Sequence, residues 1–162
     1  MTTLRKKNRL ETFLYKEGYF FITINVQNHA CVFGEVVGEE MKNNQYGKIV
    51  EKCWYDLPNH YGNCKLLDLI IMPNHLHAII SVEKGVGEGF KPSLTKKHGL
   101  SEVIRGFKTF SSRRLHESGL TSFKRQRSFY DHVIRNEQDL LRIQEYIHLN
   151  SYKRKNDEYY IG

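Results

Sequence analysis

Two histidines separated by a single leucine, His75 and His77, have the spacing in this sequence that best suits a metal ion. They follow a Pro-Asn pair and open a run of apolar residues. Side chains alternate between the two faces of a β-strand, so both imidazoles lie on one face and can reach the same ion. The alternative is two ordinary histidines at a strand end, but two unpaired polar rings in so apolar a strand would be costly. The spacing therefore predicts a metal site on one face of this strand.

A tyrosine and an asparagine, Tyr146 and Asn150, lie four residues apart in a segment with helical spacing of apolar residues. At this separation their side chains share one face of the helix. A tyrosine can attack a phosphodiester and form a covalent intermediate. Free tyrosine has a pKa of about 10, so such a site must assist deprotonation. The chain has ten tyrosines, most of them necessarily structural or on the surface, and Tyr130 in an extended segment is the main competitor.

Three other polar residues near these positions have simpler explanations. Asp68, in the strand beside the histidines, is more readily explained by a salt bridge or a turn than by a place among the metal ligands. His148 lies off the Tyr146 face of its helix and is expected to be exposed to solvent. His132 could contact a phosphate or cap a strand.

The size and charge of the chain favour a single domain with an anionic partner. The length of 162 residues and the hydrophobic content of 40% fit one domain with its own core. The net charge is +7, with fourteen Lys/Arg against eight Asp/Glu from Lys96 onward and eleven against ten before it. A solvated basic face would explain a modest excess, but this excess lies in the same half as Tyr146. Nucleic acid is therefore the favoured partner.

The rest of the composition indicates a reduced, intracellular protein. The three cysteines are far apart and no pair has zinc-site spacing. No apolar segment of the signal-peptide type follows the basic N-terminus, and no run is long enough to span a membrane. We expect a single domain over residues 1–162 in the cytoplasm of a prokaryotic cell, close to the nucleoid. Within it we expect a basic arm at 1–17, a flexible loop at 83–98 and a polar tail at 151–162.

The spacing of apolar residues predicts the order strand, helix, strand, strand, helix, strand, helix. The predicted strands are residues 18–26, 64–71, 75–82 and 123–134, and the predicted helices are residues 41–57, residues 100–116 and a last one beginning at Asn136. Residues 28–38 form a short connection with room for a small edge hairpin. The first six elements match an α+β, ferredoxin-like (split βαβ) arrangement, an antiparallel sheet with helices on one face. His75 and His77 would project from the other face, which the final helix could cover.

One glycine, Gly106, stands inside the predicted helix 100–116. Glycine in a helix interior costs about 1 kcal/mol relative to alanine. Close packing against a neighbouring element would explain its presence.

Six stretches spread over most of the chain form a specific combination, although the His-x-His pair alone would be weak. They are Met72-Pro73-Asn74-His75-Leu76-His77, the strand 19–23, the helix end 54–58, residues 99–108, residues 128–136 and Tyr146-Ile147-His148-Leu149-Asn150. Together they resemble the REP-associated tyrosine transposases, a family of the single-tyrosine HUH class, whose Tyr-Ile-x-x-Asn signature the last stretch matches. Ser151 stands where members usually have proline, and no tryptophan precedes the predicted fourth strand.

This resemblance implies roles for the residues above. It implies that Tyr146 is the nucleophile, that His75 and His77 bind an essential divalent cation, and that Asn150 is a further ligand. It also implies a DNA transposase that cleaves and rejoins single-stranded DNA beside hairpins, forming a 5′-phosphotyrosine link and freeing a 3′-hydroxyl. Two imidazoles and an amide suit several first-row metals, so the choice of Mg²⁺ or Mn²⁺ comes from the family. A homodimer would supply the coordinated cuts that moving an element needs, although related proteins can act as monomers.

Six basic residues in the C-terminal half are predicted to contact DNA. They are Lys124, Arg125 and Arg127 at the start of the predicted fourth strand, Lys108 and Arg113 on the polar face of helix 100–116, and Arg135 before the last helix. Such contacts to the DNA backbone make binding weaker as the salt concentration rises.

Two other functions stay open from the sequence. Sheets of this type can stack bases on aromatic residues, and Tyr19 and Phe21 share one strand face, so the chain could be a non-catalytic module that binds single-stranded nucleic acid. The RNA-recognition signature of such sheets is absent from the sequence. A metal-dependent hydrolase could instead use activated water, with Tyr146 only structural. Incubation with single-stranded DNA distinguishes the three functions. A transposase forms a covalent adduct, a binding module leaves the DNA unchanged, and a hydrolase cleaves it without an adduct.

Overall fold

The structure is a computed structural model that describes residues 18–83, 99–125 and 128–149. The predicted basic arm and polar tail, and nearly all of the predicted loop, lie outside these ranges. None of the helices within them is long and apolar enough to cross a membrane.

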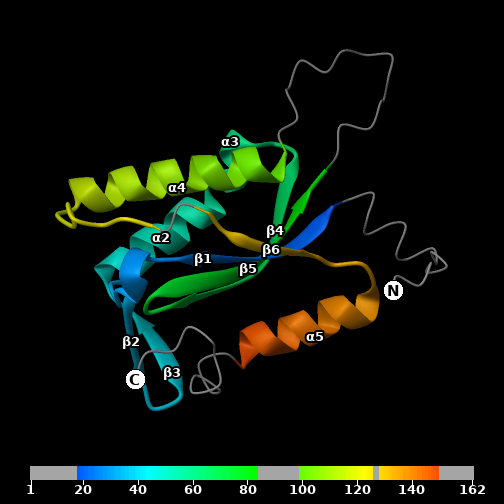
Figure 1. Ribbon diagram of the computed structural model, residues 1–162, viewed down its shortest axis with the longest axis horizontal. Helices are drawn as coiled ribbons and strands as arrows, with labels where there is room; N and C mark the ends of the chain where they lie inside the picture. The colour runs from blue at the N-terminus through cyan, green and yellow to red at the C-terminus, as the bar shows by residue number, and fades with distance from the viewer. Residues whose placement is uncertain (1–17, 84–98, 126–127, 150–162) are drawn as a thin grey trace.

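A four-stranded antiparallel sheet forms the centre of the fold, with the strand order β4-β5-β1-β6 (Figure 1). Its strands are β1 (Tyr19–Asn25), β4 (Cys64–Met72), β5 (His75–Val82) and β6 (Tyr130–Val133). Strand β1 pairs with β5 on one side and with β6 on the other, and β4 and β5 form a hairpin. This topology confirms the predicted α+β, ferredoxin-like arrangement.

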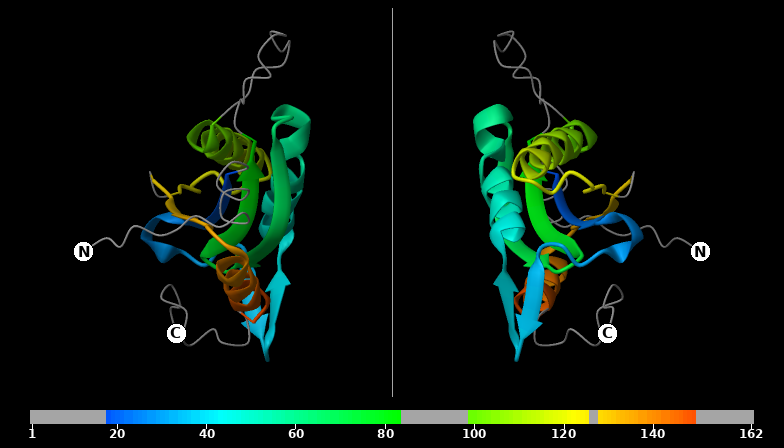
Figure 2. Two further views of the ribbon diagram at one scale, coloured as in Figure 1. Left: turned by 90° about the vertical axis from the view of Figure 1, so that its right-hand side faces the viewer. Right: turned by 90° about the vertical axis from the view of Figure 1, so that its left-hand side faces the viewer.

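Helices lie on both faces of this sheet (Figures 1 and 2). They are α2 (Gln45–Tyr55), α3 (Leu57–His60), α4 (Leu100–Glu117) and α5 (Glu137–His148). Helices α2 and α4 pack together over one face, and α5 lies on the other. The two layers on either side of the sheet are therefore built by different parts of the chain.

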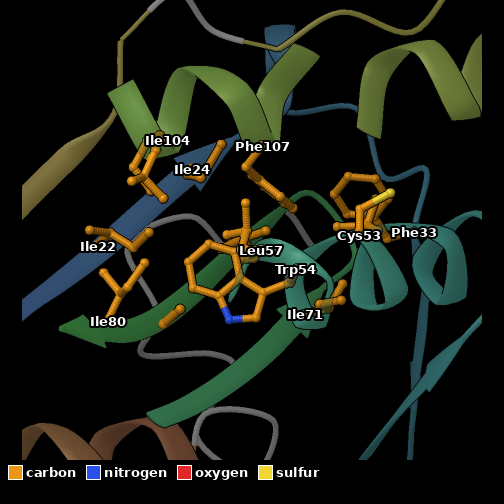
Figure 3. Close-up of a cluster of buried hydrophobic side chains, with 14 of the residues drawn as sticks. Ile22, Ile24, Phe33, Cys53, Trp54, Leu57, Ile71, Ile80, Ile104 and Phe107 are labelled. Atoms are coloured by element: carbon orange, nitrogen blue, oxygen red, sulfur yellow. The ribbon is translucent and has the colours of Figure 1, made fainter. Parts of the chain in front are cut away.

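The main core lies between the sheet and helices α2 and α4. Alternation along β1 directs Ile22 and Ile24 into it, and both are almost fully buried. The rings of Trp54 and Phe107 meet there with centroids 5.1 Å apart and an interplanar angle of 89° (Figure 3). Burial of each large apolar side chain contributes about 1.5–3 kcal/mol, so this layer supplies most of the apolar stabilisation.

The opposite face of the sheet is covered by α5. Ile143 and Ile147 of α5 pack against Ile79 of β5 and against Ile134, which follows β6. Leu140 is partly buried beside them. The final helix therefore docks on the sheet of its own chain, through the apolar positions that the sequence indicates.

Asparagine side chains determine where two of the helices begin. Asn136 accepts a hydrogen bond from the backbone N–H of Asp139 at 2.8 Å, so α5 begins where the sequence predicts. Asn44 accepts from two backbone N–H groups in the first turn of α2. The predicted start of this helix at residue 41 is therefore wrong, because the cap lies three residues later.

Met41 belongs instead to strand β3 (Glu40–Asn43), which pairs with β2 (Gly34–Val37) in a small separate sheet. The hairpin that the sequence allowed within 28–38 is thus formed by residues 34–43. The predicted helix also ends early: α2 stops at Tyr55 and the short α3 follows, because Pro58 has no N–H to continue the hydrogen bonding.

The fourth strand is shorter than the predicted 123–134. Of the residues described in this segment, Tyr130–Val133 join the ladder of β1, and Arg125 forms an isolated bridge with Val26. The side chain of Arg125 donates a hydrogen bond to α4. This contact holds the segment against the helix and away from the strand ladder.

Gly106 lies where α4 meets Tyr61, and this close packing explains a glycine inside the helix. A Cβ atom at Gly106 would lie 1.9 Å from Tyr61 Oη and 2.8 Å from its Cζ. Any larger side chain at this position must displace the tyrosine ring.

We expect Gly106→Ala to lower the free energy of unfolding by about 1–2 kcal/mol, because the overpacking outweighs the better helix propensity of alanine. Urea unfolding would measure the change. Gly62→Ala is the matched control, because a Cβ there has no atom within 4 Å. In a Tyr61→Ala background the substitution should be neutral or stabilising, and a loss that persisted there would show that Tyr61 is not its cause.

Candidate active site

The imidazoles of His75 and His77 meet on the face of β5 that α5 covers, and both are almost fully buried. Their Nε2 atoms lie 3.1 Å apart. Each Nδ1 atom has a polar partner behind it, Asn74 Oδ1 at 2.6 Å from His75 and Thr23 Oγ1 at 2.9 Å from His77. An amide oxygen can only accept a hydrogen bond, so Nδ1 of His75 carries a proton and, in the neutral ring, Nε2 keeps its lone pair.

This geometry suits a pair of metal ligands. Histidines that bind a metal through one ring nitrogen usually donate a hydrogen bond from the other. Two imidazole nitrogens, each about 2.1 Å from one ion and at right angles around it, are about 3.0 Å apart. The observed 3.1 Å is close to that value. In residues 18–83, 99–125 and 128–149, no group of three or more His, Cys, Asp or Glu could hold a metal ion. The predicted third ligand, Asn150, lies outside these ranges.

Tyr146 lies on the side of α5 that faces the histidine pair. Its Oη is 3.4 Å from Nε2 of His77. Its ring meets Phe21 edge-on at 6.1 Å, and Phe21 stacks on His77 at 5.4 Å. Tyr146 is 39% exposed, so solvent reaches its side chain while one edge of the ring is held. The structure thus brings three of the four predicted catalytic and metal-binding residues together.

Sequence reasoning does not single out Thr23 or Asn74 as site residues. Asn74 has the features of a turn residue, and Thr23 is one of several alternating positions on β1. Thr23 lies opposite His77 in the β1–β5 ladder, and that register is a long-range property which spacing alone does not give. Once the strands are paired, a polar side chain directly opposite a buried histidine is the signal that identifies it.

A carboxylate on the sheet ties down the helix that carries Tyr146. Asp68 of β4 accepts a hydrogen bond from Gln144 Nε2 at 2.7 Å and pairs with His148 Nε2 at 3.0 Å. Gln144 and His148 are four residues apart, so they share one side of α5, off the face that carries Tyr146. The exposure expected for His148 is confirmed, and His148 and Asp68 are each other's partners, forming an ion pair when the imidazole is protonated.

Three of the predicted DNA contacts line one groove along α4. Lys108, Arg113 and Arg125 lie with Ser112 around an open space of about 580 Å³; we call this the α4 groove. The Nζ atom of Lys108 donates a hydrogen bond to the Ser128 carbonyl at 3.1 Å. Because α4 and α5 cover opposite faces of the sheet, the α4 groove lies on the face opposite Tyr146.

The other predicted DNA contacts lie elsewhere. Arg135 lines a separate groove of about 390 Å³ at the start of α5. His132 lines the same groove and pairs with Asp139 at 2.8 Å. Lys124 is exposed, and Arg127 lies outside the described residues. Within the described part of the C-terminal half, the predicted DNA contacts thus lie in separate places rather than in one groove.

Comparisons with known proteins find a relative in sequence and similar solved structures. An uncharacterized protein of Haemophilus influenzae (strain ATCC 51907 / DSM 11121 / KW20 / Rd) is 33% identical over 168 residues, which cover 97% of this chain and 93% of that protein. No protein-family model matches the chain.

The first solved structure is a REP-associated tyrosine transposase bound to a REP hairpin, with a TM-score of 0.61 and 19% identity over 95% of this chain and 74% of that chain. The second is a candidate transposase from Deinococcus radiodurans R1, with a TM-score of 0.52 and 15% identity over 91% of this chain and 96% of that chain. These likenesses confirm, at the level of the fold, the resemblance to REP-associated tyrosine transposases.

We expect Asp68→Ala to loosen α5 specifically, because two contacts from that helix lose their acceptor. Backbone amides of α5 should exchange faster in hydrogen–deuterium exchange, and the free energy of unfolding should fall by about 1–2 kcal/mol.

The matched control for this experiment is Asp56→Ala. Asp56 also accepts from an amide and pairs with a histidine, Asn59 and His60, but it lies between α2 and α3 on the other side of the sheet. Exchange in α5 should be unchanged in this variant. Equal exchange in the two variants would contradict the role of Asp68 in holding α5.

Proposed function

We propose that this chain, which belongs to the same protein family as the Haemophilus influenzae protein and has the fold of a REP-associated tyrosine transposase, is a single-tyrosine DNA transposase. The observation that carries the proposal is the 3.4 Å distance between Tyr146 Oη and His77 Nε2. It supports the proposal because a partly exposed tyrosine hydroxyl lies beside two imidazole nitrogens whose geometry suits a metal ion. The proposed substrate is single-stranded DNA beside a hairpin, and the hairpin carried by the solved neighbour supports this choice.

In the proposed reaction, Tyr146 Oη forms a bond to the scissile phosphorus while the bond from that phosphorus to the 3′ oxygen of the preceding nucleotide breaks. The phenol loses a proton and the 3′ oxygen gains one, so the step needs no other reactant. It leaves a 5′-phosphotyrosine and a free 3′-hydroxyl. The covalent link conserves the bond energy, and attack by a 3′-hydroxyl then rejoins a strand.

The residues around Tyr146 orient the reacting groups. A divalent cation, Mg²⁺ or Mn²⁺, on His75 and His77 with Asn150 would withdraw negative charge from a non-bridging phosphate oxygen. Thr23 and Asn74 fix both Nδ1 atoms and so keep the Nε2 atoms directed at one point. We place this reaction in the cytoplasm, and in a homodimer where two cuts are coordinated.

The nucleophile is tested by Tyr146→Phe, which removes only the hydroxyl and should leave folding and DNA binding intact. With a single-stranded suicide oligonucleotide, the wild-type protein should give a band of lower mobility that survives denaturing electrophoresis. Tyr146→Phe should give none. Tyr130→Phe is the matched control, since Tyr130 is also exposed and lies on β6, and it should form the adduct like the wild type.

Each contrary result of this experiment points to a particular alternative. An adduct in the Tyr146→Phe protein, or peptide mapping that places the DNA on Tyr130, would make Tyr146 structural. Cleavage without any adduct would indicate a hydrolase that uses activated water. Binding without cleavage or adduct would indicate a non-catalytic module.

The metal site is tested by Mn²⁺ titration followed by electron paramagnetic resonance, which does not depend on activity. The double substitution His75→Ala/His77→Ala should abolish specific binding. Thr23→Val keeps the shape of the side chain but removes the partner of His77 Nδ1, so it should weaken binding about 10–100-fold. Thr109→Val, which changes an exposed threonine on α4, should bind Mn²⁺ like the wild type. Unchanged Mn²⁺ binding in the double variant would refute the site.

A further inference from the structure

The guanidinium of Arg125 is packed into the protein beside α4. Its central carbon lies 5.1 Å from the ring centroid of Phe107 and 4.8 Å from that of Phe123. Its Nη1 atom donates hydrogen bonds to the hydroxyls of Ser111 at 2.7 Å and Ser112 at 3.2 Å. Its Nη2 atom is also buried but has no hydrogen-bond partner within the described chain. The contacts with the two phenylalanine rings and the hydrogen bonds of Nη1 explain how this segment is attached to α4. They leave Nη2 without an acceptor.

Among the residues that the structure describes, the charge of Arg125 has no nearby carboxylate partner. Within the residues that the structure describes, no Asp or Glu forms an ion pair with it. Burial lowers the pKa of Arg125 to about 9, which leaves it positively charged at neutral pH. The pKa of Lys108 is also lowered, first by burial and then by the charge of Arg125, so two cations lie close together. A buried charge without a counter-ion is costly, and a bound anion would offset that cost.

Both cations line the α4 groove, and its other walls add suitable donors. Ser112 contributes a hydroxyl group and Arg113 contributes a second guanidinium, whereas the hydroxyl of Thr109 donates to the Arg105 carbonyl. Glu117 is the carboxylate in the lining, so the groove keeps an excess of positive charge. Arginine, lysine and hydroxyl side chains are the groups that commonly bind the phosphates of a DNA backbone.

We propose that the α4 groove binds a backbone phosphate in the double-stranded stem of a DNA hairpin, with Arg125 as its buried ligand. This inference rests on the proposed function for the identity of the DNA. Helices α4 and α5 lie on opposite faces of the sheet (Figure 1). With helices about 10 Å in diameter on both faces, the groove and Tyr146 are on the order of 20 Å apart. A phosphate next to the scissile one cannot span that distance, so a more distant part of the DNA occupies the groove.

The path between the two sites runs past the edge of the sheet. The segment that carries Arg125 leads into β6, which is the edge strand beside β1 (Figure 1). DNA that passes over this edge reaches both faces. The stem would then lie on the α4 side, and the single strand to be cut would lie on the α5 side.

Fluorescence anisotropy with two labelled DNAs tests this inference: a hairpin with a single-stranded extension, and the extension alone. Arg113→Gln and Arg114→Gln form a matched pair, because each removes one exposed charge from neighbouring positions on α4. Only Arg113 lines the α4 groove, whereas Arg114 lines a different cavity, beside Lys52.

We expect Arg113→Gln to weaken hairpin binding about tenfold and to reduce the slope of log affinity against log salt concentration by about one. The loss should be smaller on the extension alone, and Arg114→Gln should change neither.

Arg125→Gln should weaken hairpin binding more than Arg113→Gln, if circular dichroism shows the wild-type fold. If this variant does not fold, the hairpin affinities of Arg113→Gln and Arg114→Gln decide whether the inference holds. Equal losses of hairpin affinity in Arg113→Gln and Arg114→Gln would overturn the inference, because they would reflect a general attraction between the protein and DNA charges. Equal losses on the hairpin and on the extension alone would also overturn it.

Adduct formation by the wild-type protein on the hairpin with its single-stranded extension tests the proposed function separately. If no adduct forms but hairpin binding depends on Arg113 and not on Arg114, the phosphate site stands and the transposase function fails. If the adduct forms but hairpin binding is indifferent to Arg113, the function stands and the phosphate site is wrong.

Discussion

The burial of strand β5 on both faces is the constraint on which the rest of the structure depends. One face contributes Leu76, Ala78 and Ile80 to the main core beneath α2 and α4, and the other directs His75 and His77 toward α5. A shift of one residue in register would exchange the two faces and move both imidazoles into the apolar layer. The packing that stabilises the fold therefore also fixes the position of the histidines. Their polar atoms must be satisfied locally, and the neighbouring asparagine and threonine side chains do this.

Helix α5 is attached to the sheet more lightly than the histidines are held within it. Its apolar contacts come mainly from Ile143 and Ile147, and its polar contacts to β4 all meet at the single carboxylate of Asp68. Local opening free energies are lowest where few buried contacts hold an element. The structure thus combines a rigid pair of imidazoles with a helix whose attachment can be weakened at one position.

Local patterns predict much of this fold, and long-range pairing accounts for what they miss. Alternation gives the two faces of each central strand, and a good N-cap at Asn136 gives the start of α5. The cap at Asn44 goes unrecognised because apolar spacing extends across it. The contact between Thr23 and His77 needs the register of β1 against β5. The burial of Arg125 also escapes the sequence, since a run of basic residues looks the same whether its side chains face solvent or pack between aromatic rings.

The position of Tyr146 determines how a phosphate would enter the proposed site. Its Oη lies 3.4 Å from Nε2 of His77, whereas an attacking oxygen must lie about 3–3.5 Å from the phosphorus itself. A cation on the histidines and a phosphate bound to that cation cannot both fit between two atoms at the observed spacing. The histidines are buried in the sheet and cannot retreat, but Tyr146 is 39% exposed and has solvent on one side. For the proposed reaction, the tyrosine side chain would therefore have to swing outward to admit the phosphate, while Ile143 and Ile147 keep its helix in place. In the proposed reaction the two histidines would be organised in advance, and Tyr146 would adapt to the DNA.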